Sequence, residues 1–221
     1  YIYRLMKKNY IYTLLLATIA LFSTTRIQAQ EFHFMPKVGF SLATLMGLDG
    51  SARSGANVGV SGEYIFPDDM FAVEAGVYYS MQGATKKHNY GGEYISANLN
   101  NDYINIPIYA KAYVYKGLNI FAGPQLGFNV HNKFKLDGHK KEYVAVNVDK
   151  LFYPFDFSLC VGGGYQFENG LFFTLNYNFG LTDVLKYKDI QIEGETNYFP
   201  LMADESTVRN GVFQANIGWR V

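Results

Sequence analysis

Six charged side chains lie in stretches where apolar and polar residues alternate, and their types could support acid–base chemistry. Three are basic and three are acidic: Lys37, Lys111, Arg220, Glu63, Glu74 and Asp156. Paired carboxylates can act as general acid and general base. A structural role is the simpler interpretation, because a buried charge that loses its partner costs roughly 3–5 kcal/mol. We therefore predict an internal ion-pair and hydrogen-bond network, and neither a catalytic site nor a permeation pathway.

A second group resembles the parts of a hydrolase, which needs a nucleophile, a base and an orienting acid. His131 lies at the outer end of a predicted strand on its predicted inner face, with Asp156 across the sheet and Ser158 one step below. A rim histidine among polar neighbours is the simpler interpretation. His131 and His139 lack a tight ligand spacing for a metal, and Gly162–Gly164 lie inside a strand pattern with no helix after them, unlike a phosphate loop. We predict no catalytic residue, no metal and no cofactor, and expect that the chain is not an enzyme.

The elements that would position these side chains are strands. Phe71–Gln82 alternates strictly between two unlike faces, which is a strong strand signal. Pro107 interrupts another such segment and indicates a bulge or one missing ladder bond. The eight predicted strands are Lys37–Leu45, Asn57–Phe66, Phe71–Gln82, Tyr103–Tyr115, Leu118–His131, Phe155–Phe167, Leu171–Thr182 and Gly211–Val221.

Short and long connections alternate between these strands. The short ones are Pro67–Met70, Lys116–Gly117 and Glu168–Gly170, and the long ones are about 46–56, 83–102, 132–154 and 183–210. A soluble β-sandwich has no reason to place every long loop at one end, whereas outer-membrane barrels have short periplasmic turns and long extracellular loops. We therefore predict an all-β fold over residues 30–221: an eight-stranded antiparallel up-and-down transmembrane β-barrel with both termini on the periplasmic side.

Composition agrees with a barrel and excludes other classes. The chain has 19 Tyr, 18 Phe and 22 Gly, which suits aromatic girdles around a polar lumen. Cys160 is the single cysteine, so no internal disulfide can form. Without residues 1–29 the chain keeps 15 basic side chains against 19 acidic ones. This balance argues against nucleic-acid binding, which needs a clustered basic excess.

The first 29 residues have the pattern of a secretory signal peptide. Met6-Lys7-Lys8 reads as a natural translation start, and a short apolar run from Ile11 to Phe22 follows it. Small residues then lead to Ala29, after which we predict cleavage. The run is too short for a helix of roughly 20 residues that crosses a bilayer. We expect export through the Sec pathway, with an uncleaved N-terminal anchor as the alternative.

Several short motifs together resemble the PorT-like outer-membrane β-barrel family of Gram-negative bacteria. They are residues 37–41 (KVGFS), 103–108 (YINIPI), 122–127 (AGPQLG), 162–165 (GGGY) and 176–182 (NYNFGLT). The resemblance spans the whole mature chain and implies an eight-stranded barrel, and one branch of the family assists protein secretion. Members of the family often have Glu at the position of Asn105 and Arg at the position of Asn176. In this chain two inward-facing amides would therefore replace an interior ion pair.

Any specific function is expected in the outer loops, because an eight-stranded barrel leaves an interior just filled by side chains. One loop is basic, with Lys133, Lys135, Lys140 and Lys141, and the last loop is acidic. Ordinary solvated loops are the simplest interpretation. The sharper hypotheses are that the two loops pair above the barrel or that the basic loop contacts lipopolysaccharide phosphates.

The predicted protein is thus a monomeric outer-membrane barrel, surrounded by outer-membrane lipid, with a structural, adhesion or binding role. The alternatives are an accessory of a secretion system, whose partner would be a secretion-machinery protein, and a barrel enzyme that acts on lipid or peptide.

Overall fold

The computed structural model describes residues 32–48, 50–90, 93–137, 142–147, 149–186 and 207–221. This part of the chain forms β1 (Phe32–Met46), β2 (Ser51–Ile65), β3 (Phe71–Tyr90), β4 (Glu93–Tyr115), β5 (Leu118–Asp137), β6 (Glu142–Asn147), η1 (Asp149–Leu151), β7 (Phe155–Gln166), β8 (Leu171–Gly180) and β9 (Arg209–Trp219). Among the described residues there is no helix with the length and apolar character to span a membrane. The predicted signal peptide, residues 1–29, lies outside them.

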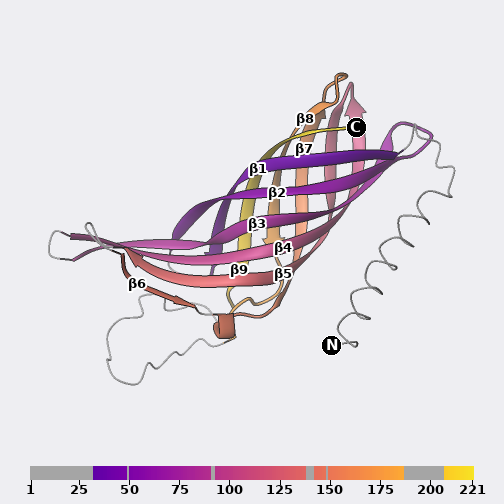
Figure 1. The fold of residues 1–221 in the computed structure, drawn as a ribbon. Coiled ribbons are helices and arrows are strands. Elements are labelled where there is room, and N and C mark those ends of the chain that lie inside the picture. Colours follow the sequence, from indigo (N-terminus) through magenta and orange to yellow (C-terminus); the bar gives the residue numbers. More distant parts are fainter. Residues whose placement is uncertain (1–31, 49, 91–92, 138–141, 148, 187–206) are drawn as a thin grey trace, which may run out of the picture.

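Eight strands form a closed ring (Figure 1). Their order is β4-β3-β2-β1-β9-β8-β7-β5, and the pairing of β4 with β5 closes the ring. Every pair of neighbours is antiparallel. The ninth strand, β6, pairs with the end of β5 beyond the ring. The predicted all-β, eight-stranded, up-and-down barrel is confirmed.

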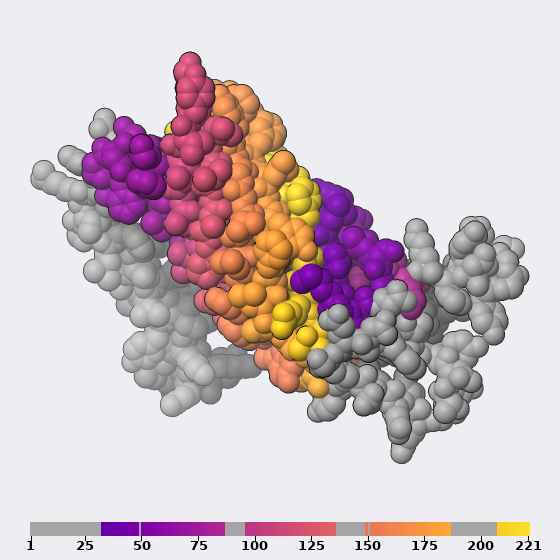
Figure 2. Space-filling view, turned by 180° about the vertical axis from the view of Figure 1, so that it is seen from behind, coloured from indigo at the N-terminus to yellow at the C-terminus, as the bar shows by residue number. Residues whose placement is uncertain are grey.

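The two faces of the strands differ as the alternation predicts. On the outer face Val77, Ile120 and Leu175 are 51%, 56% and 57% exposed. On the inner face Glu63 and Glu74 are 0% and 1% exposed. Figure 2 shows the outer wall where β7, β8, β9 and β1 lie side by side. Because successive side chains on a strand point to opposite faces, one register fixes which residues enter the lumen.

One end of the ring carries the short turns. At the β4–β5 turn Lys116 and Gly117 have φ angles of 38° and 86°, as a two-residue hairpin turn requires. The start of β1 and the C-terminal residue also meet at this end, where the amide of Phe34 donates a hydrogen bond to the carbonyl of Val221 at 3.0 Å. We call this the turn end and the opposite one the loop end.

The loop end differs from the prediction, since strands occupy much of what was predicted as long loops. β3 and β4 stay paired from Phe71↔Ala112 to Tyr90↔Glu93, so residues 83–90 and 93–102 form a projecting pair of strands (Figure 1). β5 runs on to Asp137 and pairs with β6. The predicted loops over 83–102 and 132–154 were therefore wrong for most of their length.

Pro107 causes a local gap in the ladder without a change of register. The β3–β4 pairing passes from Ala75↔Ile108 to Tyr78↔Asn105. This agrees with a missing ladder bond and not with a bulge. Bulges lie elsewhere, and the one between Asp102 and Tyr103 matters for the site.

Large lumen side chains lie over glycines of neighbouring strands. A Cβ atom added to Gly162 would lie 2.5 Å from the Cζ atom of Phe121, and one added to Gly218 would overlap Phe172. Glycine is therefore needed where an aromatic ring crosses the next strand. These rings help to fill the interior.

Candidate functional site

Five of the six predicted lumen charges meet near the turn end, from four strands and the residue after β9. Lys111 Nζ lies 2.7 Å from Glu63 Oε1 and 2.7 Å from Glu74 Oε2. Lys37 Nζ lies 2.8 Å from Glu74 Oε1. Arg220 Nη1 lies 3.6 Å from Glu63 Oε2. The cluster therefore joins three cations to two carboxylates.

The two carboxylates face each other directly, because Glu63 and Glu74 are partners in the β2–β3 register. Like charges in this arrangement destabilise a sheet, and Lys111 compensates by bridging both. Hydroxyl groups add further bonds: Tyr113 donates to Glu63 Oε1 at 2.8 Å, and Ser61 donates to Glu74 Oε1 at 2.8 Å. Hydrogen bonds to charged acceptors are among the strongest in proteins. The cluster therefore links neighbouring strands through side-chain ion pairs and hydrogen bonds.

Asp156 lies apart from this cluster, nearer the loop end, because its β7 position pairs with Gly127 of β5. It accepts hydrogen bonds from Thr182 Oγ1 at 2.7 Å and from Asn210 Nδ2 at 2.9 Å. Both of these partners are neutral groups. The alternation of faces along the strand predicted correctly that Asp156 points into the barrel, but it could not predict the height of Asp156 along the barrel axis.

Between these levels the lumen is lined by amides. Asn176 donates to Gln214 Oε1 at 3.0 Å and accepts from Asn216 Nδ2 at 3.1 Å. Asn105 is also buried, on β4 opposite Tyr78. Both positions that differ from the PorT-like pattern thus hold inward amides, and Asn176 belongs to a hydrogen-bonded row between β8 and β9.

A hydrophobic cluster that the sequence did not predict fills the loop end of the lumen. Its buried members are Leu45, Ala84, Ala97, Leu99, Phe134, Phe152, Val184 and Val208. Val184 and Val208 are both 0% exposed. The backbone amide of Val184 donates to the carbonyl of Val208 at 2.8 Å, which ties the two segments together. We call these eight residues the apolar cap. Extending the alternation past Gln82 would have placed Ala84 inside, but not Phe134, which the bulge in β5 turns inward.

A β-bulge on β5 changes which residues face outward at the loop end. Asp102 pairs with His131 and Tyr103 pairs with Asn129, so Val130 is an extra residue. Beyond the bulge Asn132 is buried, and its amide donates to Asp149 Oδ1 at 2.8 Å. His131 is exposed on the opposite, outer face. The prediction that His131 faces the lumen was wrong, and His131 is separated by the sheet from Asp156 and Ser158.

Only part of the predicted basic loop lies among the described residues, and that part belongs to a strand. Lys133 and Lys135 lie in β5, where their inward neighbour Phe134 belongs to the apolar cap. Lys140 and Lys141 lie outside the described residues, as do His139 and most of the predicted acidic loop. Asp183, at the start of that loop, accepts from the amides of Leu185 and Val208.

A second polar group, which the sequence did not predict, lies on the outer face beside the bulge. Tyr79 donates its hydroxyl to Asp102 Oδ2 at 2.7 Å, and Arg53 Nη1 lies 3.8 Å from Asp102 Oδ1. Arg53 also donates to the carbonyl of Gln82. Asp102 therefore interacts with Tyr79 and Arg53, its neighbours on the outer face.

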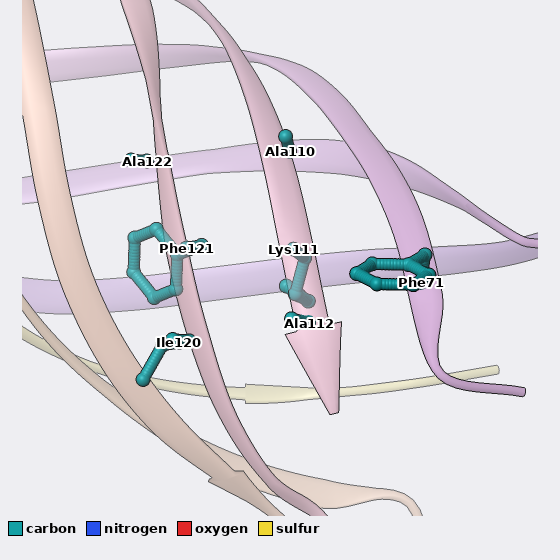
Figure 3. Close-up of a pocket in the computed structure, with 7 residues that line it drawn as sticks. All are labelled: Phe71, Ala110, Lys111, Ala112, Ile120, Phe121 and Ala122. Carbon is teal, nitrogen blue, oxygen red and sulfur yellow. The ribbon is translucent and has the colours of Figure 1, made fainter. Parts of the chain in front are cut away.

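A shallow groove of about 270 Å³ lies on the outer face nearer the turn end (Figure 3). Ala112 pairs with Phe71 of β3 and with Ile120 of β5, and Ala110 pairs with Ala122. Figure 3 shows Ala112 between the two larger side chains. The groove results from small residues flanked by large ones, and its lining is almost wholly apolar. It suits hydrocarbon and offers no reactive group.

The described residues include no group of three or more His, Cys, Asp or Glu side chains arranged to hold a metal ion. The five clustered lumen charges hold one another in place, so the geometry supports a structural role for them.

A closed antiparallel ring with an apolar, aromatic outer face and an ion-paired interior defines a transmembrane β-barrel. The chain belongs to the family described as outer membrane protein beta-barrel domain, whose profile matches residues 28–186. It is therefore a protein of the bacterial outer membrane.

Solved structures with related folds include three barrels of low sequence identity. Neisserial surface protein A is 11% identical, with 86% of this chain and 97% of that chain covered and a TM-score of 0.47. Ail of Yersinia pestis, solved with the heparin analogue sucrose octasulfate, is 13% identical, with 86% and 99% covered and a TM-score of 0.44. The translocator domain of the autotransporter NalP from Neisseria meningitidis is 8% identical, with 98% of both chains covered and a TM-score of 0.37. Such values give no basis for transferring a function. No curated protein matches the sequence.

Proposed function

We propose that this protein is a non-conducting, monomeric outer-membrane barrel that binds a partner at the cell surface through its loop end, in adhesion or envelope integrity. The turn end faces the periplasm, as in other outer-membrane barrels. Export through the Sec pathway by the predicted signal peptide belongs to the same proposal.

The observation that carries the proposal is the extension of β3, β4 and β5 beyond the ring. The β3–β4 hairpin continues past Gln82 and Asn101 to Tyr90 and Glu93. β5 extends beside it, and β6 adds a further strand. A barrel that only spanned a membrane would not need this ordered sheet. Loops and extensions on a rigid scaffold are where binding functions concentrate.

The test removes the extension and keeps the ring. Thr85 and Asn98 are register partners, and Thr85 Oγ1 donates to Asn98 Oδ1 at 2.9 Å. Replacing residues 86–97 with Asn-Gly would therefore give a tight hairpin in the same register. We expect cells that express the shortened protein to lose adhesion to one another and to protein-coated surfaces. Heat-modifiable migration on a gel serves as the control for an intact ring.

Unchanged adhesion with an intact ring would contradict the proposal. A defect in protein secretion on deletion of the gene, with normal adhesion, would instead support the alternative of a PorT-like secretion accessory. That alternative rests on the motif resemblance at residues 103–108 and 176–182 and requires a periplasmic or membrane partner. The enzyme alternative would require lipid or peptide turnover that His131→Ala abolishes, and the outward position of His131 does not favour it.

A further inference from the structure

Among the described residues, Asp156 is the one predicted lumen charge that has no oppositely charged partner, because the other five pair with one another. Its two hydrogen bonds come from Thr182 Oγ1 at 2.7 Å and Asn210 Nδ2 at 2.9 Å, and both donors are neutral. Asp156 is only 6% exposed. Taking a carboxylate out of water is costly unless an opposite charge compensates it. We therefore expect a positive charge beside Asp156.

Two glycines bring side chains of other strands close to Asp156. A Cβ atom added to Gly127 would lie 3.4 Å from Asp156 Cβ and 3.4 Å from Tyr103 Cδ1, so Tyr103 and Asp156 meet over this glycine. Gly180 of β8 lies between β7 and β9, and a Cβ atom there would lie 2.6 Å from the carbonyl oxygen of Asn210. Without that Cβ atom, the side chain of Asn210 reaches across β8 to Asp156.

Several polar atoms around Asp156 make no hydrogen bond. They are Oδ1 of Asn210, both side-chain polar atoms of Asn101 and the hydroxyl of Tyr103. These three residues are 3%, 0% and 1% exposed. The Tyr103 hydroxyl lies beside the side chains of Asn101 and Asn210, but its single proton can satisfy only one of the two amide oxygens. Buried polar atoms of this kind indicate a bound ion or water.

The orientation of Asn210 favours a cation over water. Its Nδ2 atom donates to Asp156 Oδ2, and turning the amide over would place an oxygen against the carboxylate. Because Oδ1 is bonded to the same carbon atom as Nδ2, the amide oxygen of Asn210 is held next to a negative charge. A carboxylate, amide oxygens and a hydroxyl are the hard oxygen ligands that such cations take.

The charge of these groups selects a monovalent cation. Asp156 supplies one negative charge, whereas Asn101, Tyr103 and Asn210 are neutral. A divalent cation would leave one positive charge uncompensated in the interior, and calcium takes about six to eight oxygen ligands, carboxylates among them. A single carboxylate with neutral oxygens therefore suits an ion of charge +1.

The apolar cap covers this group from the loop end. Val208 lies two residues before Asn210, and Val184 lies two residues after Thr182. Both valines are 0% exposed and belong to the cap. An ion beside Asp156 would therefore be enclosed, which predicts that it is taken up during folding and exchanges slowly afterwards.

We propose that Asp156, Asn210, Tyr103 and Asn101 bind one monovalent alkali-metal cation, sodium or potassium, beneath the apolar cap. This site goes beyond the proposed binding role, since it lies inside the barrel and takes an inorganic ion. The shortened hairpin described above retains all four residues, so the two proposals can fail separately.

The first experiment refolds the barrel in detergent with sodium chloride, potassium chloride or choline chloride at the same ionic strength. Choline is too bulky for a site among packed side chains. The unchanged protein is therefore expected to melt about 5 °C higher in at least one alkali salt than in choline chloride. The salt with the larger effect identifies the ion. Asp156→Asn keeps the size of the side chain without its charge, so this variant should melt at one temperature in all three salts.

The matched control is Asp69→Asn, because Asp69 is an exposed carboxylate of the turn between β2 and β3. It is expected to keep the full response to the alkali salt. Asn101→Leu provides a second comparison if Asp156→Asn does not fold, since it removes the unsatisfied amide and keeps the carboxylate. The alkali-salt response of this variant should be smaller than that of the unchanged protein.

The second experiment uses the enclosure of the site. Protein refolded in the alkali salt is exchanged exhaustively into choline chloride, and its alkali metal is counted by elemental mass spectrometry. We expect one ion per barrel in the unchanged protein and in Asp69→Asn, none in Asp156→Asn, and release of the ion on heat unfolding. Equal melting temperatures of the unchanged protein in the three salts would overturn the proposal and leave bound water as the partner of these atoms. Equal ion content of the unchanged protein and Asp156→Asn would overturn it as well.

Discussion

Glu63 and Glu74 show how single residues cooperate in the lumen. They face each other across β2 and β3 and would repel, yet both are almost fully buried. Lys111 contacts both, whereas the Nζ atom of Lys37 pairs with Glu74. The three cations are therefore not equivalent, and Lys111 is the one whose loss would leave two carboxylates facing each other.

We expect Lys111→Met to lower the free energy of unfolding by about 3–5 kcal/mol, because it leaves buried carboxylates without their shared cation. Lys37→Met should cost less, since Glu74 keeps Lys111. Urea titration of the barrel in lipid vesicles, followed by tryptophan fluorescence of Trp219, measures both. Lys116→Met, at the exposed turn, is the control. Equal stability of the Lys111 and Lys116 variants would show that the bridge contributes nothing.

At the scale of elements, β5 has two distinct parts. Its first part belongs to the membrane-spanning ring, with Leu118 and Ile120 outward. Its second part follows the bulge and packs Phe134 into the apolar cap with Phe152. Asn129 donates to Asn132 Oδ1 at 2.9 Å across the bulge, which holds the two parts together.

We expect Phe134→Ala to loosen the loop end alone. Removing a buried aromatic side chain costs about 3–5 kcal/mol where the cavity cannot collapse. Hydrogen exchange of amides in β6 and η1 should accelerate, while amides in β8 stay protected. Phe128→Ala removes an outward ring of the same strand, where lipid can fill the space, and serves as the control. A uniform acceleration across β8 and β6 would contradict a separate cap.

The sequence predicts regular strands better than their irregularities. Period-two alternation in Phe71–Gln82 predicted which side chains of β3 face inward and which face outward. The turn residues Lys116 and Gly117 predicted the hairpin between β4 and β5. The bulge at Val130 was not predictable, because an extra residue leaves composition and hydrophobicity unchanged and reverses only the faces after it. His131 was misplaced for this reason. The height of Asp156 depends on strand register across β5 and β7, which alternation along a single strand cannot supply.

At the scale of the whole molecule, the barrel lumen holds fully buried side chains at two heights along its axis. Glu63 and Cys160 are 0% exposed although they face the barrel interior, and Val184 and Val208 in the cap are 0% exposed as well. These side chains are inaccessible to solvent in the structure, and we infer from this that the ion network and the cap each obstruct the axis. This agrees with the general rule that eight strands enclose a filled interior.

In a planar bilayer the reconstituted protein should therefore give no conductance above that of the bare membrane. The Phe134→Ala variant is also expected to stay closed, because the ion network near the turn end is untouched. Current recordings with matched amounts of folded and heat-denatured protein provide the comparison. Steady conductance steps from the folded protein would contradict a sealed lumen.

The ring has one seam whose strands come from opposite ends of the barrel sequence. β1 and β9 pair from Lys37↔Gly218 to Met46↔Arg209, whereas other neighbours in the ring follow one another along the chain. Each of those pairs joins ring strands that are consecutive in the sequence, whereas the seam joins the first ring strand to the last. Until it forms, two unpaired edges would meet hydrocarbon, where nothing can hydrate them. The consequence is topological: no continuous segment of the chain that lacks β1 or β9 can close this ring, so both strands must be present before the barrel is free of unpaired edges.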